Sequence, residues 1–453
     1  MAARRDKLAN EVTFDRMQWL LDKLYNEKDR LSAYMKTLMC CDKSMRWQRQ
    51  TSTEQESPLA YFDSHLNASQ QDAVQMALDA EHVALVHGPP GTGKTQTVIE
   101  IIRQLNRRKK KLLVCGPSNI SVDNIVERLH ALHVPCVRIG HPARVLPSIT
   151  QCTLDVQLRE SDAAEIVGGI RKEMQACIDK AGHRKTSKAE RRELYQTIKA
   201  LRKDLKVREK VAVAQMMKGT GVICSTLTGC GSRTLRNEAF DVVIIDEATQ
   251  SVEPECYLAA VLGEKVILAG DHLQLPPTIQ SEKASALEET LFMRLLKRYG
   301  SECKTLLDTQ YRMHDVIMQW SSALLYEGKL KADASVKAHL LCDLAAIDTT
   351  AETEVPFVVI DTLGSNMFEM SEEGQFKAEE GSKYNPGEAD LVTAYVEKLI
   401  AAGLAQTQIA VISPYNAQVA LLKKRIKETH PAIEIGSGTL FLRSRCAPRK
   451  KSI

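Results

Sequence analysis

The sequence predicts an α/β fold built on parallel strands that are joined by crossover helices. From residue 65 onwards, short apolar runs alternate with stretches of helical periodicity, which is typical of such sheets. A second block of the same kind contains "NPGEADLVTAYVEKLIAAG" (385–403), which has proline near its start and glycine at its end, as helices do. The expected strands of the first block are 83–87, 112–115, 222–224, 241–245 and 265–269, and those of the second are 356–361 and 408–413.

Two helical segments flank or interrupt this pattern. Residues 5–50 carry apolar positions at helical spacing, which predicts one or two long, partly exposed helices before a polar break at 51–58. Residues 155–216 are rich in Arg, Lys, Glu and Leu and nearly free of Gly and Pro, which predicts a helical hairpin. The expected domains are a helical segment 1–60, a first lobe 61–300 with the insertion 155–216, a second lobe 301–435 and a basic tail 436–453.

Composition limits the class of protein. The 453 residues suffice for two or three domains, and the net charge of +4 is too small to indicate nucleic acid by itself. The twelve cysteines form no CxxC pair, so we expect neither disulfides nor zinc, and a reducing compartment. No signal peptide or long apolar segment is apparent, so we expect a soluble intracellular protein without membrane contact. A monomer and a cytoplasmic or nuclear location are further expectations, which this composition does not decide.

The stretch "GPPGTGKT" predicts a nucleotide site. It fits G-x-x-x-x-G-K-T and lies between an expected strand and an expected helix. Backbone N–H groups wrap the phosphates, Lys94 reaches the β and γ oxygens, and the Thr95 hydroxyl binds Mg²⁺. ATP and Mg²⁺ are therefore the expected cofactors. The loop residues are Gly88, Pro89, Pro90, Gly91, Thr92, Gly93, Lys94 and Thr95.

Phosphate transfer also needs acidic groups, and "FDVVIIDEATQ" (240–250) offers two at the end of an apolar strand. We expect Asp246 to hold Mg²⁺ and Glu247 to polarise the attacking water. The alternative is that these acids only cap the following helix.

Three further stretches indicate what the ATP is used for. "VILAGDHLQLPP" (266–277) presents Gln274, which can touch both the γ-phosphate and the water. "LDTQYRMH" (307–314) places Tyr311 to stack on adenine and Arg312 to bind the γ-phosphate, and "HLNASQ" (65–70) offers Gln70 to pair with adenine. With Lys94 and Glu247, Gln274 and Arg312 complete the expected catalytic set.

With "CGPSNISVDNIVERL" (115–129), "RIGHPARVLPSI" (138–149) and "IAVISPYNAQVALL" (409–422), these stretches resemble the superfamily 1B helicases. This group contains the nonsense-mediated-decay helicase, and the nearer branch is that of the immunoglobulin-mu-binding helicase. The resemblance runs from about residue 7 to about residue 435. It implies N-terminal stalk helices and two recA-like lobes, the second incomplete, with ATP between them. It also implies ATP-dependent 5′→3′ unwinding of DNA and RNA. It also points to partners in ribosome- or tRNA-associated complexes.

The resemblance further implies contacts with single-stranded RNA and DNA at turns that follow strands. Backbone N–H and hydroxyl groups there suit phosphate rather than base contact. The alternative for each residue is a helix cap or a turn. The insertion 155–216 corresponds to a flap over the nucleic-acid channel, or else to a plain solvated helical pair. The expected contact residues are Pro117, Ser118, Asn119, Thr226, Ser413, Pro414 and Tyr415.

The sequence also departs from the family. It has no counterpart of the small N-terminal β-barrel, of the C-terminal nucleic-acid-binding and zinc-finger modules, or of the segment with a second arginine finger. An arginine finger is worth about 10³–10⁵ in turnover. We therefore expect nucleotide binding with little or no unwinding, and the alternative function is a truncated nucleotide- and nucleic-acid-binding product. Residues 436–453 predict a disordered basic tail that carries Arg443, Arg445, Arg449, Lys450 and Lys451.

Overall fold

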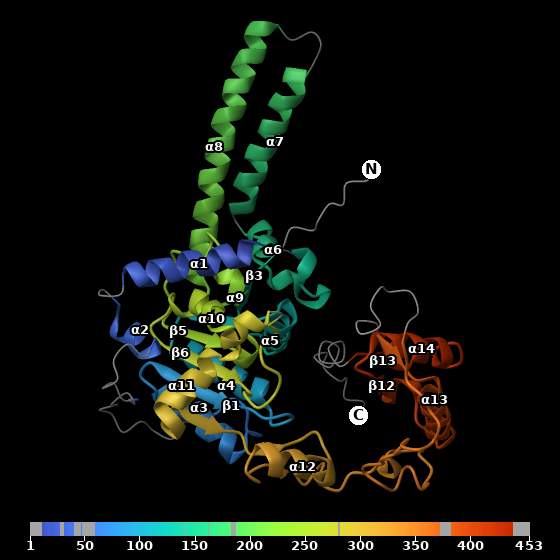
Figure 1. Ribbon diagram of the computed structural model, residues 1–453. Coiled ribbons are helices and arrows are strands. Elements are labelled where there is room, and N and C mark those ends of the chain that lie inside the picture. Colours follow the sequence, from blue (N-terminus) through green and yellow to red (C-terminus); the bar gives the residue numbers. More distant parts are fainter. Residues whose placement is uncertain are drawn as a thin grey trace. The chain divides into compact units, whose positions relative to one another are not determined.

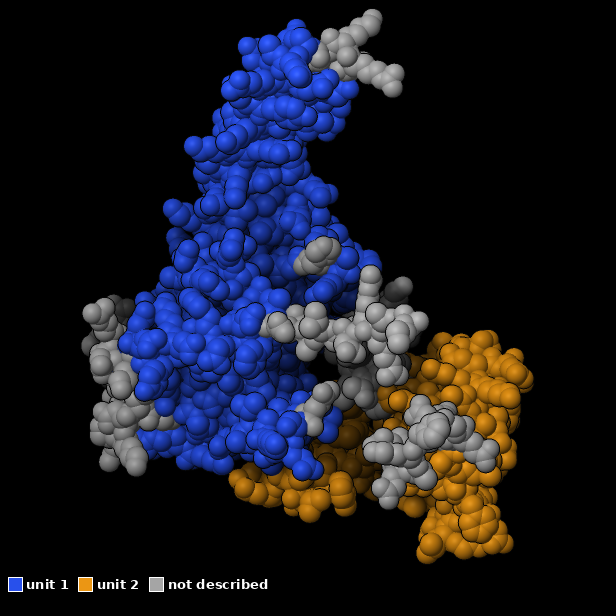
Figure 2. Space-filling model, turned by 45° about the horizontal axis from the view of Figure 1, so that its top comes forward, with its two compact units in different colours: residues 1–89, 93–307 blue, residues 90–92, 308–453 orange. Residues whose placement is uncertain are grey.

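The structure is a computed structural model that describes residues 11–27, 31–39, 47, 59–140, 142–161, 163–182, 187–279, 281–371 and 382–437. The chain separates into two compact units, 1–89 with 93–307 and 90–92 with 308–453 (Figure 2). Each unit has its own hydrophobic core. The expected polar break at 51–58 and all but the first two residues of the expected tail lie outside the described residues.

Unit 1 contains a sheet of seven strands, all parallel, in the order β3-β4-β2-β5-β6-β1-β7. The predicted α/β class is confirmed, as are the five strands expected in this region. The structure adds β3 and β7, which the apolar pattern did not indicate. The strands are β1 (Val83–His87), β2 (Leu112–Gly116), β3 (Cys136–Ile139), β4 (Val222–Thr226), β5 (Val242–Ile245), β6 (Val266–Gly270) and β7 (Lys304–Leu306).

The central strands are continuous apolar runs because helices cover both faces of the sheet. Alternate residues of a strand point to opposite faces, so β2 divides its side chains between two core clusters. Leu113 and Cys115 belong to one cluster, and Leu112 and Val114 belong to the other. Every residue of β2 is buried.

The N-terminal helices pack on one of these faces, since Leu20, Leu24 and Leu38 join the same cluster as Leu113. The predicted hairpin is confirmed as the long pair α7 and α8, which projects from the body of unit 1 (Figure 1). The helices of unit 1 are α1 (Glu11–Asn26), α2 (Ala33–Leu38), α3 (Ala68–Asp79), α4 (Lys94–Arg107), α5 (Asn119–Ala131), α6 (Leu154–Arg159), α7 (Ala163–Gly182), α8 (Lys188–Gly219), α9 (Leu227–Cys230), α10 (Glu253–Ala260) and α11 (Leu291–Tyr299).

The sheet order divides the carboxyl edge into two halves. All seven strands are parallel, so the segments that follow them meet along one edge, where ligands bind in such folds. The segments that follow β1, β5 and β6 carry the phosphate-binding loop, Asp246, Glu247 and Gln274, and lie in one half. Those that follow β2 and β4, with β3 beside them, carry the expected nucleic-acid residues and lie in the other half.

Unit 2 is smaller and packs α13 and α14 on the parallel pair β12 and β13. The strand expected at 408–413 and the helix expected from 385 are confirmed. The strands are β8 (Thr309–Gln310), β9 (Lys331–Ala332), β10 (Met370–Ser371), β11 (Lys383–Tyr384), β12 (Ala410–Ile412) and β13 (Glu434–Gly436). The helices are α12 (Asp315–Leu325), α13 (Pro386–Ala401) and α14 (Asn416–Ile426).

The prediction of a strand at 356–361 is wrong. These residues form no strand, and Phe357 and Val359 are 63% and 73% exposed. A strand needs a neighbour for its backbone hydrogen bonds, and no strand of the described residues pairs with this stretch. An apolar pattern without a pairing partner was therefore a misleading signal.

Candidate nucleotide site and nucleic-acid edge

The loop after β1 has the backbone shape that a phosphate-binding loop requires. Gly91 and Gly93 have φ values of 78° and 77°, in the left-handed region that favours glycine. Gly93 is also the N-cap of α4, and a Cβ atom there would collide with the Gln70 side chain. The loop therefore leads directly into the N-terminus of α4, where free N–H groups favour an anion.

Lys94 lies against both predicted acids. Its Nζ is 3.2 Å from Asp246 Oδ1 and also forms an ion pair with Glu247. Burial lowers the pKa of Lys94, but the negative charges of Asp246 and Glu247 outweigh burial and raise it overall. The lysine is therefore fully charged at physiological pH.

The residues around Lys94 fit a magnesium ion. Asp246 is a buried carboxylate at the end of β5, and Thr95 follows Lys94 in the first turn of α4. Since Lys94 contacts Asp246, both oxygen donors belong to the same small region. Carboxylate and hydroxyl oxygens are hard ligands of the kind that Mg²⁺ takes.

Glu247 has a strained backbone. Its φ of 55° and ψ of 35° are left-handed, which is costly for a residue with a side chain. The Gln250 amide donates to Glu247 Oε2 at 3.0 Å. Glu247 precedes the short helix 248–250, yet its side chain makes no capping hydrogen bond, so the alternative that it only caps a helix is not supported.

A hydrogen-bonded chain at the ends of β1 and β6 holds Gln274. Its Nε2 donates to Asp271 Oδ2 at 2.6 Å, and His87 Nε2 lies 2.9 Å from Asp271 Oδ1. Burial, His87 and Lys304 lower the pKa of the neighbouring His272 to about 4. Sequence reasoning gave no role to His87, which directly precedes the phosphate-binding loop, or to Asp271, which lies inside the stretch that presents Gln274.

Gln70 is buried and caps α3. Its N–H donates to Asn67 Oδ1 at 2.9 Å, and its Oε1 accepts from the Asn67 N–H at 3.0 Å. This reciprocal pair is a capping box. The structure thus gives Gln70 a local role beside Gly93, and its contact with adenine stays a prediction.

Tyr311 and Arg312 belong to unit 2 and follow β8. Both side chains are exposed. The Tyr311 N–H donates a hydrogen bond of 2.9 Å to the carbonyl of Gly91, a loop residue that belongs to unit 2. The turn is held by fully buried Gln310, whose Oε1 accepts from the N–H groups of Arg312 and Met313 at 2.8 Å. Sequence reasoning missed Gln310. The roles of Tyr311 and Arg312 stay predictions.

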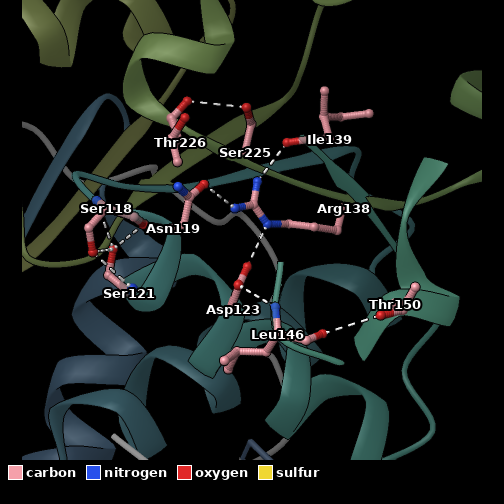
Figure 3. A network of polar contacts seen from close by, with 10 residues as sticks. All are labelled: Ser118, Asn119, Ser121, Asp123, Arg138, Ile139, Leu146, Thr150, Ser225 and Thr226. Atoms are coloured by element: carbon pink, nitrogen blue, oxygen red, sulfur yellow. Dashed lines mark hydrogen bonds and ion pairs between the residues drawn. The ribbon is translucent and has the colours of Figure 1, made fainter. Parts of the chain in front are cut away.

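In the other half of the sheet edge, two expected contact residues, Ser118 and Thr226, are helix caps. Figure 3 shows the cap formed by Ser118. The Ser121 N–H donates to Ser118 Oγ at 3.1 Å at the start of α5. The Gly229 N–H donates to Thr226 Oγ1 at 3.1 Å at the start of α9. The capping alternative is therefore correct for both residues, and contact with nucleic acid stays a prediction for them and for half-buried Pro117.

The third expected contact region follows β12 in unit 2. Ser413 is buried, and its hydroxyl accepts from the Tyr415 N–H at 3.4 Å, while Pro414 and Tyr415 are exposed. Ser413 therefore shapes this turn. Its proposed contact with nucleic acid stays a prediction.

A phosphate-binding loop whose lysine lies against an Asp-Glu pair two strands away is the arrangement of P-loop nucleoside triphosphatases. Two protein-family models, both described as AAA domain, match residues 65–282 and 287–441.

Helicases are found among the relatives. DNA polymerase alpha-associated DNA helicase A of Schizosaccharomyces pombe is 41% identical over 434 residues, which are 95% of this chain and 64% of that protein. DNA-binding protein SMUBP-2 of Mesocricetus auratus is 42% identical over 438 residues, or 95% of this chain and 43% of that protein. An ATP-dependent helicase of Methanocaldococcus jannaschii is 32% identical over 477 residues, covering 96% of this chain and 69% of that protein.

The chain belongs to the same family of superfamily 1 helicases as these relatives. It spans 64% and 43% of the length of the first two relatives. Among solved structures, an arterivirus helicase matches at a TM-score of 0.32 and 11% identity over 59% of this chain and 44% of that chain, a similarity too low to bear on function.

Two further observations concern the described residues only. None of their helices is both long and apolar enough to cross a membrane. All nine of their cysteines are free thiols.

Proposed function

We propose that this chain is the ATPase core of a superfamily 1B helicase that hydrolyses ATP and moves 5′→3′ on single-stranded RNA or DNA. The observation that carries the proposal is the cluster of Lys94, Asp246 and Glu247 at the same sheet edge as the turns after β2 and β4. One edge thus holds both the residues for phosphate chemistry and the turns suited to a nucleic-acid backbone.

The residues divide the proposed chemistry between them. The loop N–H groups bind the phosphates, and Lys94 exchanges its carboxylate partners for phosphate oxygens. Thr95 and Asp246 hold Mg²⁺, which neutralises charge on the phosphates when bound. Released from Lys94, Glu247 orients the attacking water and accepts its proton.

Gln274, Tyr311, Arg312 and Gln70 have further proposed roles. Gln274, held by Asp271, contacts the γ-phosphate and the water. The family resemblance assigns adenine stacking to Tyr311 and γ-phosphate binding to Arg312, with Gln70 on the adenine edge. An exposed guanidinium of this kind stabilises charge that develops during transfer.

The proposed partners are single-stranded RNA and DNA, bound through phosphates at Pro117–Asn119, Thr226 and Ser413–Tyr415. The hairpin of α7 and α8 is the proposed flap over this path. Action as a monomer, a cytoplasmic or nuclear location, and ribosome- or tRNA-associated complexes belong to the same proposal. They rest on the family resemblance alone.

The test is ATP turnover by the purified chain with and without single-stranded RNA, beside a Lys94→Ala variant. We expect RNA to stimulate turnover and the variant to abolish it. The matched control is Lys111→Ala. Lys111 lies away from the site, and its Nζ pairs with Glu238 Oε2 at 2.7 Å. The turnover of this variant should equal that of the parent chain. ATP binding without turnover would overturn the enzyme proposal and favour the nucleotide-binding alternative.

A further inference from the structure

A buried arginine lies directly behind the turn after β2. Arg138, in β3, is 0% exposed, and its guanidinium donates in three directions (Figure 3). Nε donates to Asp123 Oδ1 at 2.8 Å, Nη1 to the Ile139 carbonyl at 2.6 Å, and Nη2 to Asn119 Oδ1 at 3.0 Å. This fork is therefore occupied by groups of the protein itself.

Asp123 anchors the arginine from the helix that carries Asn119. It is 1% exposed and lies one helical turn after Asn119 on α5, so both side chains are on the same face. Its second oxygen accepts the Leu146 N–H at 3.1 Å. The Asp123 carboxylate thus fixes the position of the Arg138 guanidinium. Asn119 Oδ1 accepts its hydrogen bond from this fixed donor.

The guanidinium decides which way the Asn119 amide faces. Arginine only donates hydrogen bonds, so the Asn119 atom that meets it must be the carbonyl oxygen. Nδ2 then points the other way, as Figure 3 shows. Asn119 is half-buried beside exposed Ser118, and no group of the described residues hydrogen-bonds to its Nδ2. Two N–H donors are therefore directed away from Arg138, and phosphate oxygens accept such donors.

We propose that Arg138 is a positioning residue for nucleic-acid binding, which fixes the Asn119 amide so that its N–H₂ group donates to a backbone phosphate. This inference rests on the proposed function, since it assigns a partner to the turn at 117–119. It also explains a charged pair inside the unit. A buried ion pair adds little to stability compared with apolar residues of similar volume, so a role in orientation accounts for it better.

The test is a mutant cycle that removes the ion pair as a whole. Arg138→Met with Asp123→Leu fills the space without leaving a buried charge, and Asn119→Ala removes the amide. The affinity of the full chain for a fluorescent single-stranded RNA and its DNA equivalent is measured by anisotropy. Binding of a fluorescent ATP analogue in the same preparations reports an intact nucleotide half.

We expect Asn119→Ala and the double variant each to weaken oligonucleotide binding about tenfold, since one charge-assisted hydrogen bond is lost. The triple variant should bind no more weakly than the double variant, and ATP binding should not change. A separate variant, Arg138→Lys, keeps the charge beside Asp123 but lacks the fork, so it should also lose oligonucleotide affinity while remaining folded. It keeps the inference testable if the double variant does not fold.

Arg294→Met serves as a control because Arg294 is also held by several groups in unit 1. Its Nε lies 3.0 Å from both Glu253 oxygens, and its Nη2 donates to Tyr257 Oη at 2.8 Å. This variant should keep its oligonucleotide affinity.

Two results would overturn the inference while leaving the proposed function standing. The double variant could bind oligonucleotide like the parent chain, or Asn119→Ala could weaken the double variant as much as it weakens the parent. A parent chain that binds no oligonucleotide at all would instead remove the proposed function, and the inference with it.

Discussion

The two halves of the sheet edge each place a cation against a carboxylate, but they do so differently. In the nucleotide half, the flexible Lys94 ammonium lies between Asp246 and Glu247, which are themselves the predicted metal-binding and water-activating groups. In the other half, each of the three guanidinium nitrogens of Arg138 donates a hydrogen bond, to Asp123, the Ile139 carbonyl and Asn119. The proposed role of the lysine requires it to exchange its carboxylate partners for phosphate, whereas the arginine keeps the Asn119 side chain in one orientation.

This difference follows from the chemistry of the two cations. Lysine carries a compact charge on a rotatable stem, and arginine carries a planar fork with set directions. The comparison therefore predicts that charge changes in the nucleotide half mainly affect ATP turnover. Changes at Arg138 should mainly affect the free energy of unfolding and oligonucleotide affinity.

The largest expected effect is on turnover in the nucleotide half. Glu247→Gln keeps the size of the side chain and its contact with Gln250 but cannot accept a proton, so strand-stimulated ATP turnover should fall by about 10²–10⁴. ATP should still bind. Single-turnover hydrolysis and analogue binding measure the two separately.

The matched control for Glu247 is Glu238→Gln, because Glu238 also pairs with a lysine of unit 1. Its turnover should stay at the parent level. Turnover retained in Glu247→Gln would mean that another group activates the water.

The next largest effect is on stability in the other half. Arg138→Met alone leaves Asp123 charged and buried without its partner, which should lower the free energy of unfolding by about 3–5 kcal/mol. Adding Asp123→Leu should recover most of this loss. Urea unfolding of both variants measures the difference, and equal stability of the two would contradict a buried ion pair.

A smaller effect is the pH dependence of stability that comes from His272, which lies beside the nucleotide half. The His272 pKa is about 4 in the folded chain, mainly through burial, and about 6.5 when unfolded. The unfolded chain therefore binds more protons between these values, and stability falls as pH falls from 6.5 to 4. We expect His272 to contribute about 1–2 kcal/mol to this fall, after allowing for its partial exposure.

Carboxylates titrate in the same window, so the measurement compares two chains. The pH dependence of urea unfolding should be shallower in His272→Gln than in the parent chain. Identical slopes would show that His272 is not desolvated in the folded chain.

The smallest expected effect lies outside both halves, on the hairpin. Arg171 and Glu209 form an exposed pair at 2.7 Å between α7 and α8. Arg171→Ala should change the free energy of unfolding by less than about 0.5 kcal/mol, because exposed ion pairs are screened by water. A larger loss in thermal unfolding would mean that the hairpin is held chiefly by this pair.

Much of the nucleotide half was predictable from the sequence. The loop and the Asp-Glu pair are short contiguous motifs, and the apolar runs before them mark buried strands. The residues that sequence reasoning missed, such as Asp271 and Gln310, lie beside predicted ones but act by holding them. Their partners are backbone groups, the Gln274 amide and the His87 imidazole, and such contacts leave no pattern in the sequence.

The sequence by itself determined the local chemistry of this protein: the loop before α4, the acids after β5 and the helical hairpin, because these depend on neighbouring residues. Tertiary structure alone decided that Lys94 meets Glu247, which is 153 residues away, and that Arg138 turns the Asn119 amide outward. It also decided that 356–361 is not a strand. The physical reason is that a hydrogen bond or a strand pairing depends on which groups lie close together in space. The strand order brings together segments that are far apart in the sequence, and nothing in either segment indicates its partner.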